Sequence, residues 1–209
     1  LEVNAAATRV KVHEGLVKFS DRSSERSVEV EAGQYSENGG AQPEVHDKTE
    51  LMPGALMPGQ ERLVPVDDAH SDRKQFINGP FLKVEHGRRT SFLKFRVPDG
   101  GGILGAKLRL TQSVDPGEGV MKAWEGSHSD WSEHSLSAET VPRALRQIGR
   151  HKGWVGLDQV IELNVSSLVD KSGAFTILLT LEDEDSNDIW FASKESPNPP
   201  ELILTRQTD

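Results

Sequence analysis

Hydrophobic and polar residues alternate with a period of two in several parts of the chain. The alternation is clear at 9–13, 27–31 and 106–111, and a nearly continuous apolar run occupies 174–181. Period-two alternation is typical of a strand with one solvated face, and a continuous apolar run of this length is typical of a buried central strand. Further short strands are expected at 91–97, 120–124, 159–165, 189–193 and 202–205.

Short strands separated by turns, without recurrent helices between them, predict an antiparallel rather than a βαβ architecture. The one helical candidate is 139–148, and it contains Pro142, which disfavours a helix interior. We predict an all-β fold: a jelly-roll-like β-sandwich over 62–209, preceded by a small β meander over 1–36. Between them, 37–61 is rich in proline and glycine and is predicted to be a linker or an extended wrap.

Composition limits the function classes. The chain has 209 residues, enough for a substantial core, with no cysteine and a formal net charge of −9. These values exclude disulfides and cysteine chemistry, and they argue against nucleic acid as a partner. No apolar run approaches the roughly 18 residues of a membrane span. The sequence begins at Leu1 without a signal segment, and we interpret it as a mature form or an excised piece.

An acidic run at 182–188 is the strongest polar cluster. Asp183 and Asp185 stand two residues apart, as in a calcium-binding EF-hand loop, but the glycine and the final glutamate of that loop are missing, so an EF-hand is rejected. A calcium site could still form between this loop and the first strand of the sandwich, through Asp67 and Asp68. The alternative is a solvated acidic loop without a metal. We carry structural Ca²⁺ forward as the expected cofactor.

Basic residues gather between positions 83 and 96, although the chain as a whole is acidic. Arginine suits bidentate recognition of anionic groups, and a uronate or a sulfated polysaccharide would supply such groups. Trp154 lies between glycines and is the tryptophan most expected to be exposed for stacking on a sugar, whereas Trp131 and Trp190 are expected to pack. The alternative for the basic residues is the solvated face of an ordinary strand. The candidate ligand-binding residues are Lys83, His86, Arg88, Arg89, Lys94, Arg96 and Trp154.

Catalytic arrangements do not stand out. There is no Gly-x-Ser-x-Gly elbow and no phosphate-binding loop, and Tyr35, the single tyrosine, lies in the N-terminal meander. A carboxylate pair for glycoside hydrolysis cannot be chosen among 33 acidic residues. We therefore predict no catalytic residue, and a polysaccharide lyase or glycosidase remains the least favoured alternative.

Several short motifs over 63–206 together resemble the DNRLRE, or disaggregatase-related, domain, which is close to alginate-binding carbohydrate-binding modules. The matching stretches are Val-Asp-Asp-Ala at 66–69, a basic and Phe-bearing strand at 89–95, Gly-Ala-Lys-Leu-Arg-Leu at 105–110, Trp-Ser-Glu at 131–133 and Phe-Ala-Ser-Lys-Glu at 191–195, then Pro-Glu-Leu at 200–202. The resemblance implies a β-sandwich that binds polysaccharide without catalysis. The chain departs from the family pattern at His70 and at 137–140.

The segment 9–35 resembles the C-terminal strands of FecR-like domains. The shared pattern consists of alternating valines, a glycine after the first strand, and Ala-Gly at 32–33. That resemblance implies a cell-surface or periplasmic protein. It also provides the second hypothesis, in which the chain is a structural or signalling region with a protein partner on its N-terminal segment.

From these observations we expect noncatalytic binding of a polysaccharide, anionic in character, by a module that is extracellular, on the cell surface or in the periplasm. The expected contact is capture of anionic groups by arginine and lysine on one strand face, with calcium supporting the loops.

Overall fold

The computed structural model divides the chain into two compact units, Leu1–Ala55 and Leu56–Asp209. Strands account for 57% of the residues and helix for 2%, which confirms the all-β prediction. Side chains are described in the second unit. The residues that the structure describes are 2–3, 8–11, 16–20, 27–31, 34–38, 44–47, 56–100, 102–168, 172–182 and 188–207.

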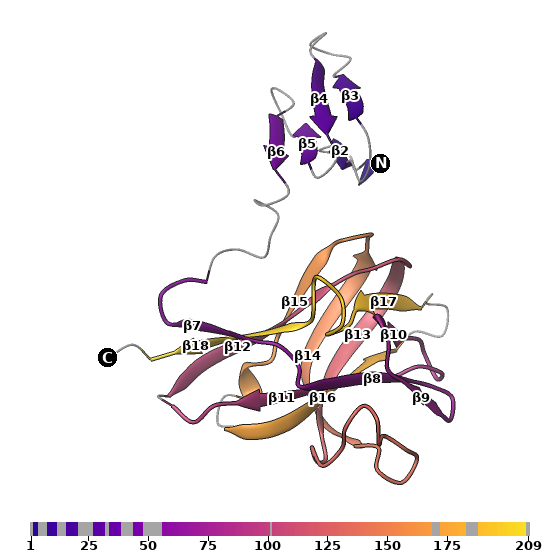
Figure 1. Ribbon diagram of the computed structural model, residues 1–209, viewed down its shortest axis with the longest axis vertical. Helices are drawn as coiled ribbons and strands as arrows, with labels where there is room; N and C mark the ends of the chain where they lie inside the picture. The colour runs from indigo at the N-terminus through magenta and orange to yellow at the C-terminus, as the bar shows by residue number, and fades with distance from the viewer. Residues whose placement is uncertain are drawn as a thin grey trace. The chain divides into compact units, whose positions relative to one another are not determined.

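The first unit consists of short antiparallel strands (Figure 1). One sheet has the order β1-β2-β5-β6, and β3 pairs with β4 as a separate two-stranded sheet. The predicted strands at 9–13 and 27–31 correspond to β2 and β4, and β6 falls within the predicted linker. The bounds are β1 Glu2–Val3, β2 Thr8–Lys11, β3 Leu16–Ser20, β4 Ser27–Glu31, β5 Gln34–Asn38 and β6 Glu44–Asp47.

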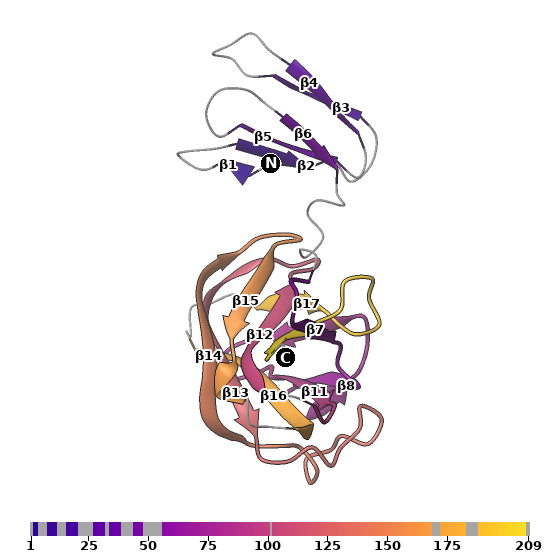
Figure 2. The same ribbon diagram turned by 90° about the vertical axis from the view of Figure 1, so that its left-hand side faces the viewer.

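The second unit is built mainly from two antiparallel sheets. The six-stranded sheet has the order β14-β13-β16-β11-β8-β9, and the four-stranded sheet has the order β15-β12-β18-β7. Figure 2 shows β13 and β14 running together along one side of this unit. The strands are β7 Gln60–Leu63, β8 Asp67–Asp72, β9 Gln75–Ile77, β10 Phe81–Val84, β11 Ser91–Val97, β12 Ile103–Thr111, β13 Gly117–Gly126, β14 Ala144–Val155, β15 Val160–Asn164, β16 Gly173–Leu181, β17 Ile189–Ala192 and β18 Glu201–Arg206, with a 3₁₀ turn at Ser166–Leu168.

The main core lies between the two sheets because alternate residues of each strand point inward. On β11, Leu93, Phe95 and Val97 are buried, and on β12 Leu108 and Leu110 are fully buried. The apolar run predicted as a central strand is β16, which lies between β13 and β11 in the six-stranded sheet. Its two-sided burial explains why its sequence is apolar almost throughout.

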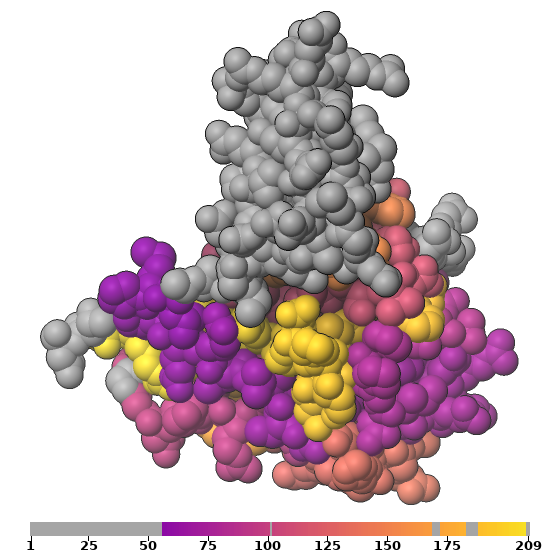
Figure 3. Space-filling model, turned by 45° about the horizontal axis from the view of Figure 1, so that its top comes forward, coloured from indigo at the N-terminus to yellow at the C-terminus, as the bar shows by residue number. Residues whose placement is uncertain are grey.

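Two strand pairings bring the beginning and the end of the second unit together. Strand β10 pairs with β17 in a separate two-stranded sheet, and β7 pairs with β18 within the four-stranded sheet. Figure 3 shows the consequence at the surface: C-terminal residues, in yellow, lie between two purple segments from the first part of the unit. Ala192 and Lys194 thereby lie close to β10 and β8, although more than a hundred positions separate them from these strands in sequence.

The loop between β13 and β14 covers part of the outer face of the six-stranded sheet. Its Trp131 is 4% exposed and packs in a second apolar cluster with Phe92 and Leu178. The indole nitrogen of Trp131 donates a hydrogen bond to Thr176 Oγ1 at 2.8 Å. Trp131 is therefore a packing residue, as its sequence context indicated.

The helical candidate at 139–148 is not a helix. The first part of that segment is loop, and β14 begins at Ala144 and continues to Val155. Pro142 breaks a helix at this position, and pairing with β13 then favours the extended conformation for the residues that follow. The pairing contains two register irregularities, opposite Trp124 and near Gly126, which also obscure the alternation in this part of the sequence.

Among the residues that the structure describes, no helix is long and apolar enough to cross a membrane.

Candidate functional site

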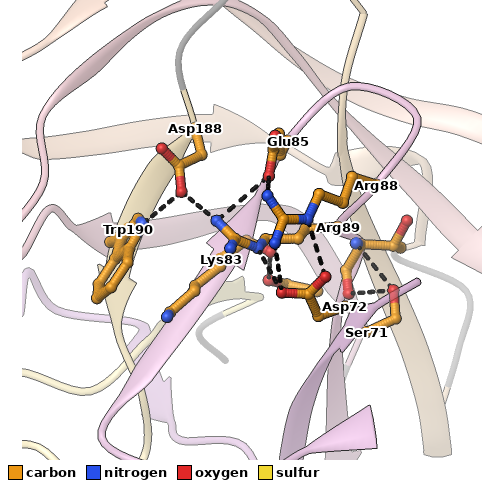
Figure 4. A network of polar contacts seen from close by, with 10 residues as sticks. Ser71, Asp72, Lys83, Glu85, Arg88, Arg89, Asp188 and Trp190 are labelled. Carbon is orange, nitrogen blue, oxygen red and sulfur yellow. Dashed lines mark hydrogen bonds and ion pairs between the residues drawn. The ribbon is translucent and has the colours of Figure 1, made fainter. Parts of the chain in front are cut away.

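Arg88 and Arg89, two of the predicted ligand-binding residues, lie in the turn after β10 and form an ion-pair network (Figure 4). Arg88 contacts Asp72 through Nε and Oδ1 at 2.9 Å, and Arg89 Nε contacts the second oxygen of Asp72 at 3.2 Å. Both guanidinium groups also reach Glu85, at 3.4 and 3.2 Å, and Arg89 pairs with Asp188. Most of the hydrogen-bonding capacity of the two arginines is thus directed to groups of the protein itself.

Lys83 lies beside this network and has no ion pair of its own within the described residues. Its ammonium lies 3.4 Å from the centroid of the Trp190 ring, and Figure 4 shows it pointing away from the carboxylates of the network. Burial, followed by the repulsion of Arg89, lowers the pKa of Lys83. The hydrogen bond from Arg88 is the main cause that lowers the pKa of Asp72. An incoming anion would have to compete with these internal carboxylates.

The other basic residues predicted to bind ligand, His86, Lys94 and Arg96, form no ion pair with this network within the described residues. His86 is in the turn, but its Nδ1 lies 3.2 Å from the carbonyl oxygen of Leu181. Lys94, on β11, is largely buried and pairs with Asp67. Arg96 is exposed further along β11, and it has no ion pair within the described residues. The sequence therefore placed several cations close together, but the structure pairs most of them.

The predicted metal ligands separate into two groups. Asp183 and Asp185 lie outside the described residues. Asp67 is engaged by Lys94, whereas Asp68 is fully buried and lies beside Glu133 and Glu195.

We refer to Asp68, Glu133 and Glu195 as the Asp68 cluster. One carboxylate oxygen of each lies within 4.8 Å of the others. Asp68 Oδ2 accepts a hydrogen bond from the Lys194 backbone N–H at 2.7 Å, whereas Asp68 Oδ1 is buried and has no hydrogen-bond partner among the described residues. Burial raises the pKa of Asp68 to about 7. The Lys194 ammonium lies 3.0 Å from Glu133 Oε2 and 2.7 Å from Glu195 Oε1.

A different surface presents two exposed cations beside an aromatic ring. Arg150, Lys152 and Trp154 occupy alternate positions on β14, and all three are exposed, Trp154 to 53%. Within the described part of the chain, Arg150 and Lys152 form no ion pair with an acidic group. We call these three residues the β14 surface.

The neighbouring strand extends this surface. Register places Lys122 opposite Arg150 and Glu118 opposite Trp154. Lys122 pairs with Glu182 at 2.6 Å and lies 5.7 Å from the centroid of the Trp124 ring. Hydrogen bonding by Lys122 is the main cause that lowers the pKa of Glu182.

Arg150 and Lys152 were not among the sequence candidates. No strand was predicted over 149–155, so the common face that a strand gives to residues two positions apart was not considered. The alternation of Arg150, Lys152 and Trp154 with His151 and Gly153 was the available signal.

An all-β sandwich that exposes cations and an indole on one strand face has features of a binding module. A family model for carbohydrate-binding module family 96 matches residues 66–206, and the chain belongs to this family. The match confirms a carbohydrate-binding module in that region. No curated protein matches the chain. The FecR-like segment at 9–35 lies outside the matched residues.

Proposed function

We propose that the chain binds an anionic polysaccharide, such as a polyuronate or a sulfated glycan, through the β14 surface. The observation that carries this proposal is the pairing pattern of the cations. Arg88 and Arg89 form ion pairs with acidic side chains, whereas Arg150 and Lys152 are exposed and form no ion pair with any acidic group that the structure describes. Cations already held by carboxylates give little to a ligand, and unpaired ones can form charge-assisted hydrogen bonds with it.

The geometry of β14 suits an extended chain. Alternate residues of a strand are about 6.7 Å apart, so Arg150 and Trp154 are separated by about 13 Å. That length accommodates more than one sugar unit. The exposed indole offers an apolar face for stacking, and the two cations beside it offer partners for carboxylate or sulfate groups.

The proposed role is noncatalytic, in agreement with the class of module that the family defines. The proposed setting is outside the cell or in the cell envelope, where structural polysaccharides occur. The ligand would bind along the sheet surface and be held there unchanged.

The test is isothermal titration calorimetry with polymannuronate, polygalacturonate and a neutral glucan. We expect heat with the uronates that decreases as salt is added, and none with the glucan. The double variant Arg150→Ala/Lys152→Ala should weaken binding by about a hundredfold or more, and each single variant by about tenfold, since each charge-assisted hydrogen bond contributes about 1.5–3 kcal/mol. Trp154→Ala should weaken it by a factor similar to that of either single variant.

Arg96→Ala is the matched control. Arg96 is an exposed arginine of the same sheet, three strands away from β14, or about 14 Å. Its removal should leave the affinity unchanged. Loss of binding in Arg96→Ala or Arg88→Ala, with full binding by the β14 variants, would contradict the proposed surface. Equal binding of the neutral glucan would contradict the anionic ligand.

A further inference from the structure

The Asp68 cluster brings together acidic groups from three distant segments of the chain. Asp68 lies on β8, Glu133 in the loop after β13, and Glu195 in the turn after β17. Asp68 is fully buried, and the side chain of Glu133 is 10% exposed. A buried carboxylate oxygen without a partner is costly, and Asp68 Oδ1 has none within the part of the chain that the structure describes.

The ion pairs that the structure describes around the Asp68 cluster do not balance its charge when all three carboxylates are ionised. The neighbouring Asp67 is paired with Lys94 and contributes no net charge. Lys194 supplies one positive charge to the three carboxylates of the Asp68 cluster, and His134, 3.5 Å from Glu133, adds another only when it is protonated. With all three ionised, two negative charges remain, which equals the charge of one divalent cation.

We infer that the Asp68 cluster is a binding site for a divalent cation, and that Ca²⁺ is the cation it suits. The side-chain ligands are all carboxylate oxygens, without the nitrogen or sulfur ligands that favour zinc or copper. Ca²⁺ accepts irregular sets of carboxylates completed by waters, whereas Mg²⁺ demands a near-ideal octahedron. This inference goes beyond the proposed function and does not depend on it.

Lys194 acts as the counter-ion of the metal-free cluster. Its ammonium bridges Glu133 and Glu195, and the side chain is 23% exposed, so it can turn outward when a cation enters. The cation would then join β8, the loop that contains Trp131, and the turn after β17. Calcium would thus stabilise the loop that covers the outer face of the six-stranded sheet.

The experiment uses the full chain without glycan, dialysed against EDTA and then titrated with CaCl₂. We expect saturable binding of one Ca²⁺ per chain by calorimetry. At about 100 times its Kd, CaCl₂ should raise the melting temperature by about 5 °C or more. MgCl₂ at the same concentration should produce a smaller shift. Tb³⁺ should show luminescence on tryptophan excitation, because Trp131 is two residues from Glu133.

The variants decide where the cation binds. Glu133→Gln/Glu195→Gln should abolish both the heat and the thermal shift, and Asp68→Asn provides a second test if the double variant does not fold. Glu118→Gln, which removes an exposed acid of β13, should behave as the wild type. Lys194→Met should bind Ca²⁺ about tenfold more tightly or better, because the competing ammonium is gone.

Three results would overturn the inference. The first is a wild-type chain that shows no calcium-dependent heat or thermal shift. The second is calcium binding that survives in Glu133→Gln/Glu195→Gln but disappears in Asp183→Asn/Asp185→Asn, since it would place the ion in the acidic loop. The third is a Lys194→Met chain whose stability is lost and is not restored by CaCl₂, because the ammonium would then be a permanent part of the cluster. Glycan titrations do not enter these measurements, so their failure leaves this test intact.

Discussion

Replacing Trp131 by alanine should destabilise the second unit strongly. The side chain is 4% exposed, lies edge-on to Phe92 with ring centroids 6.4 Å apart, and donates a hydrogen bond to Thr176. A buried tryptophan removes about 200 Å² from water, which at about 25 cal/mol per Å² corresponds to about 5 kcal/mol. Because the loop can partly collapse into the space, we expect a loss of about 4 kcal/mol, within the usual range for this substitution.

The assay is urea unfolding followed by tryptophan fluorescence. All four tryptophans lie in the second unit, so the signal reports the unfolding of that unit alone. With a slope of about 2 kcal/mol per M of urea, Trp131→Ala should lower the midpoint by about 2 M. Trp154→Ala is the control: its side chain is 53% exposed, and we expect a change within about 0.5 kcal/mol.

The two variants therefore separate packing from recognition. Trp154→Ala should keep the stability and lose polysaccharide affinity, whereas Trp131→Ala should lose stability first. A loss below about 1 kcal/mol in Trp131→Ala would refute the reasoning, because it would mean that the loop is not held to the sheet by this side chain.

The other predictions concern the four-stranded sheet and one close contact. Arg109→Met should lower the free energy of unfolding in urea by about 2 kcal/mol, because the Arg109 side chain is 14% exposed and joins acidic groups on two strands. Lys107→Met, whose side chain is 58% exposed, should lower it by less than about 0.5 kcal/mol, and equal losses in the two variants would contradict this reasoning. Hydrogen bonds from Lys107 and Arg109 lower the pKa of Glu162 below its usual 4.5, so ionised Glu162 stabilises the fold above pH 4.5 and this contribution is lost as the pH falls through the lowered pKa. Glu162→Gln should therefore flatten the acid part of a plot of unfolding free energy against pH, and an unchanged plot would contradict the pairing. Gly126→Ala should cost about 1–3 kcal/mol, because the added Cβ would lie 2.7 Å from a side-chain carbon of β16, whereas Gly79→Ala faces open space and should unfold at a nearly unchanged urea concentration.

Strands with clear alternation were predictable because their buried faces repeat every second residue. The strands at β11, β12 and β16 follow directly from the sequence at 91–97, 106–111 and 174–181. Strand β14 was not predicted, since Pro142 and the polar residues after it carry a weak periodic signal and the bulged pairing with β13 determines their conformation.

The candidate site was harder to predict because charge pairing depends on contacts that are distant in sequence. Asp72 and Asp188 reach Arg89 from 17 and 99 positions away. Local spacing shows that cations are close together, but it does not show which acids the topology brings to them. For the same reason Asp68 was recognised as a candidate ligand, while its neighbours Glu133 and Glu195 were not.

The most direct test of the central claim is a ¹H–¹⁵N NMR titration of the chain with a short oligouronate. The account predicts amide shifts concentrated on β14 around Arg150 and Trp154, and on the facing part of β13, with a shift of the Trp154 indole resonance. Shifts that instead gather around Arg88 and Arg89, with β14 unchanged at saturation, would contradict it.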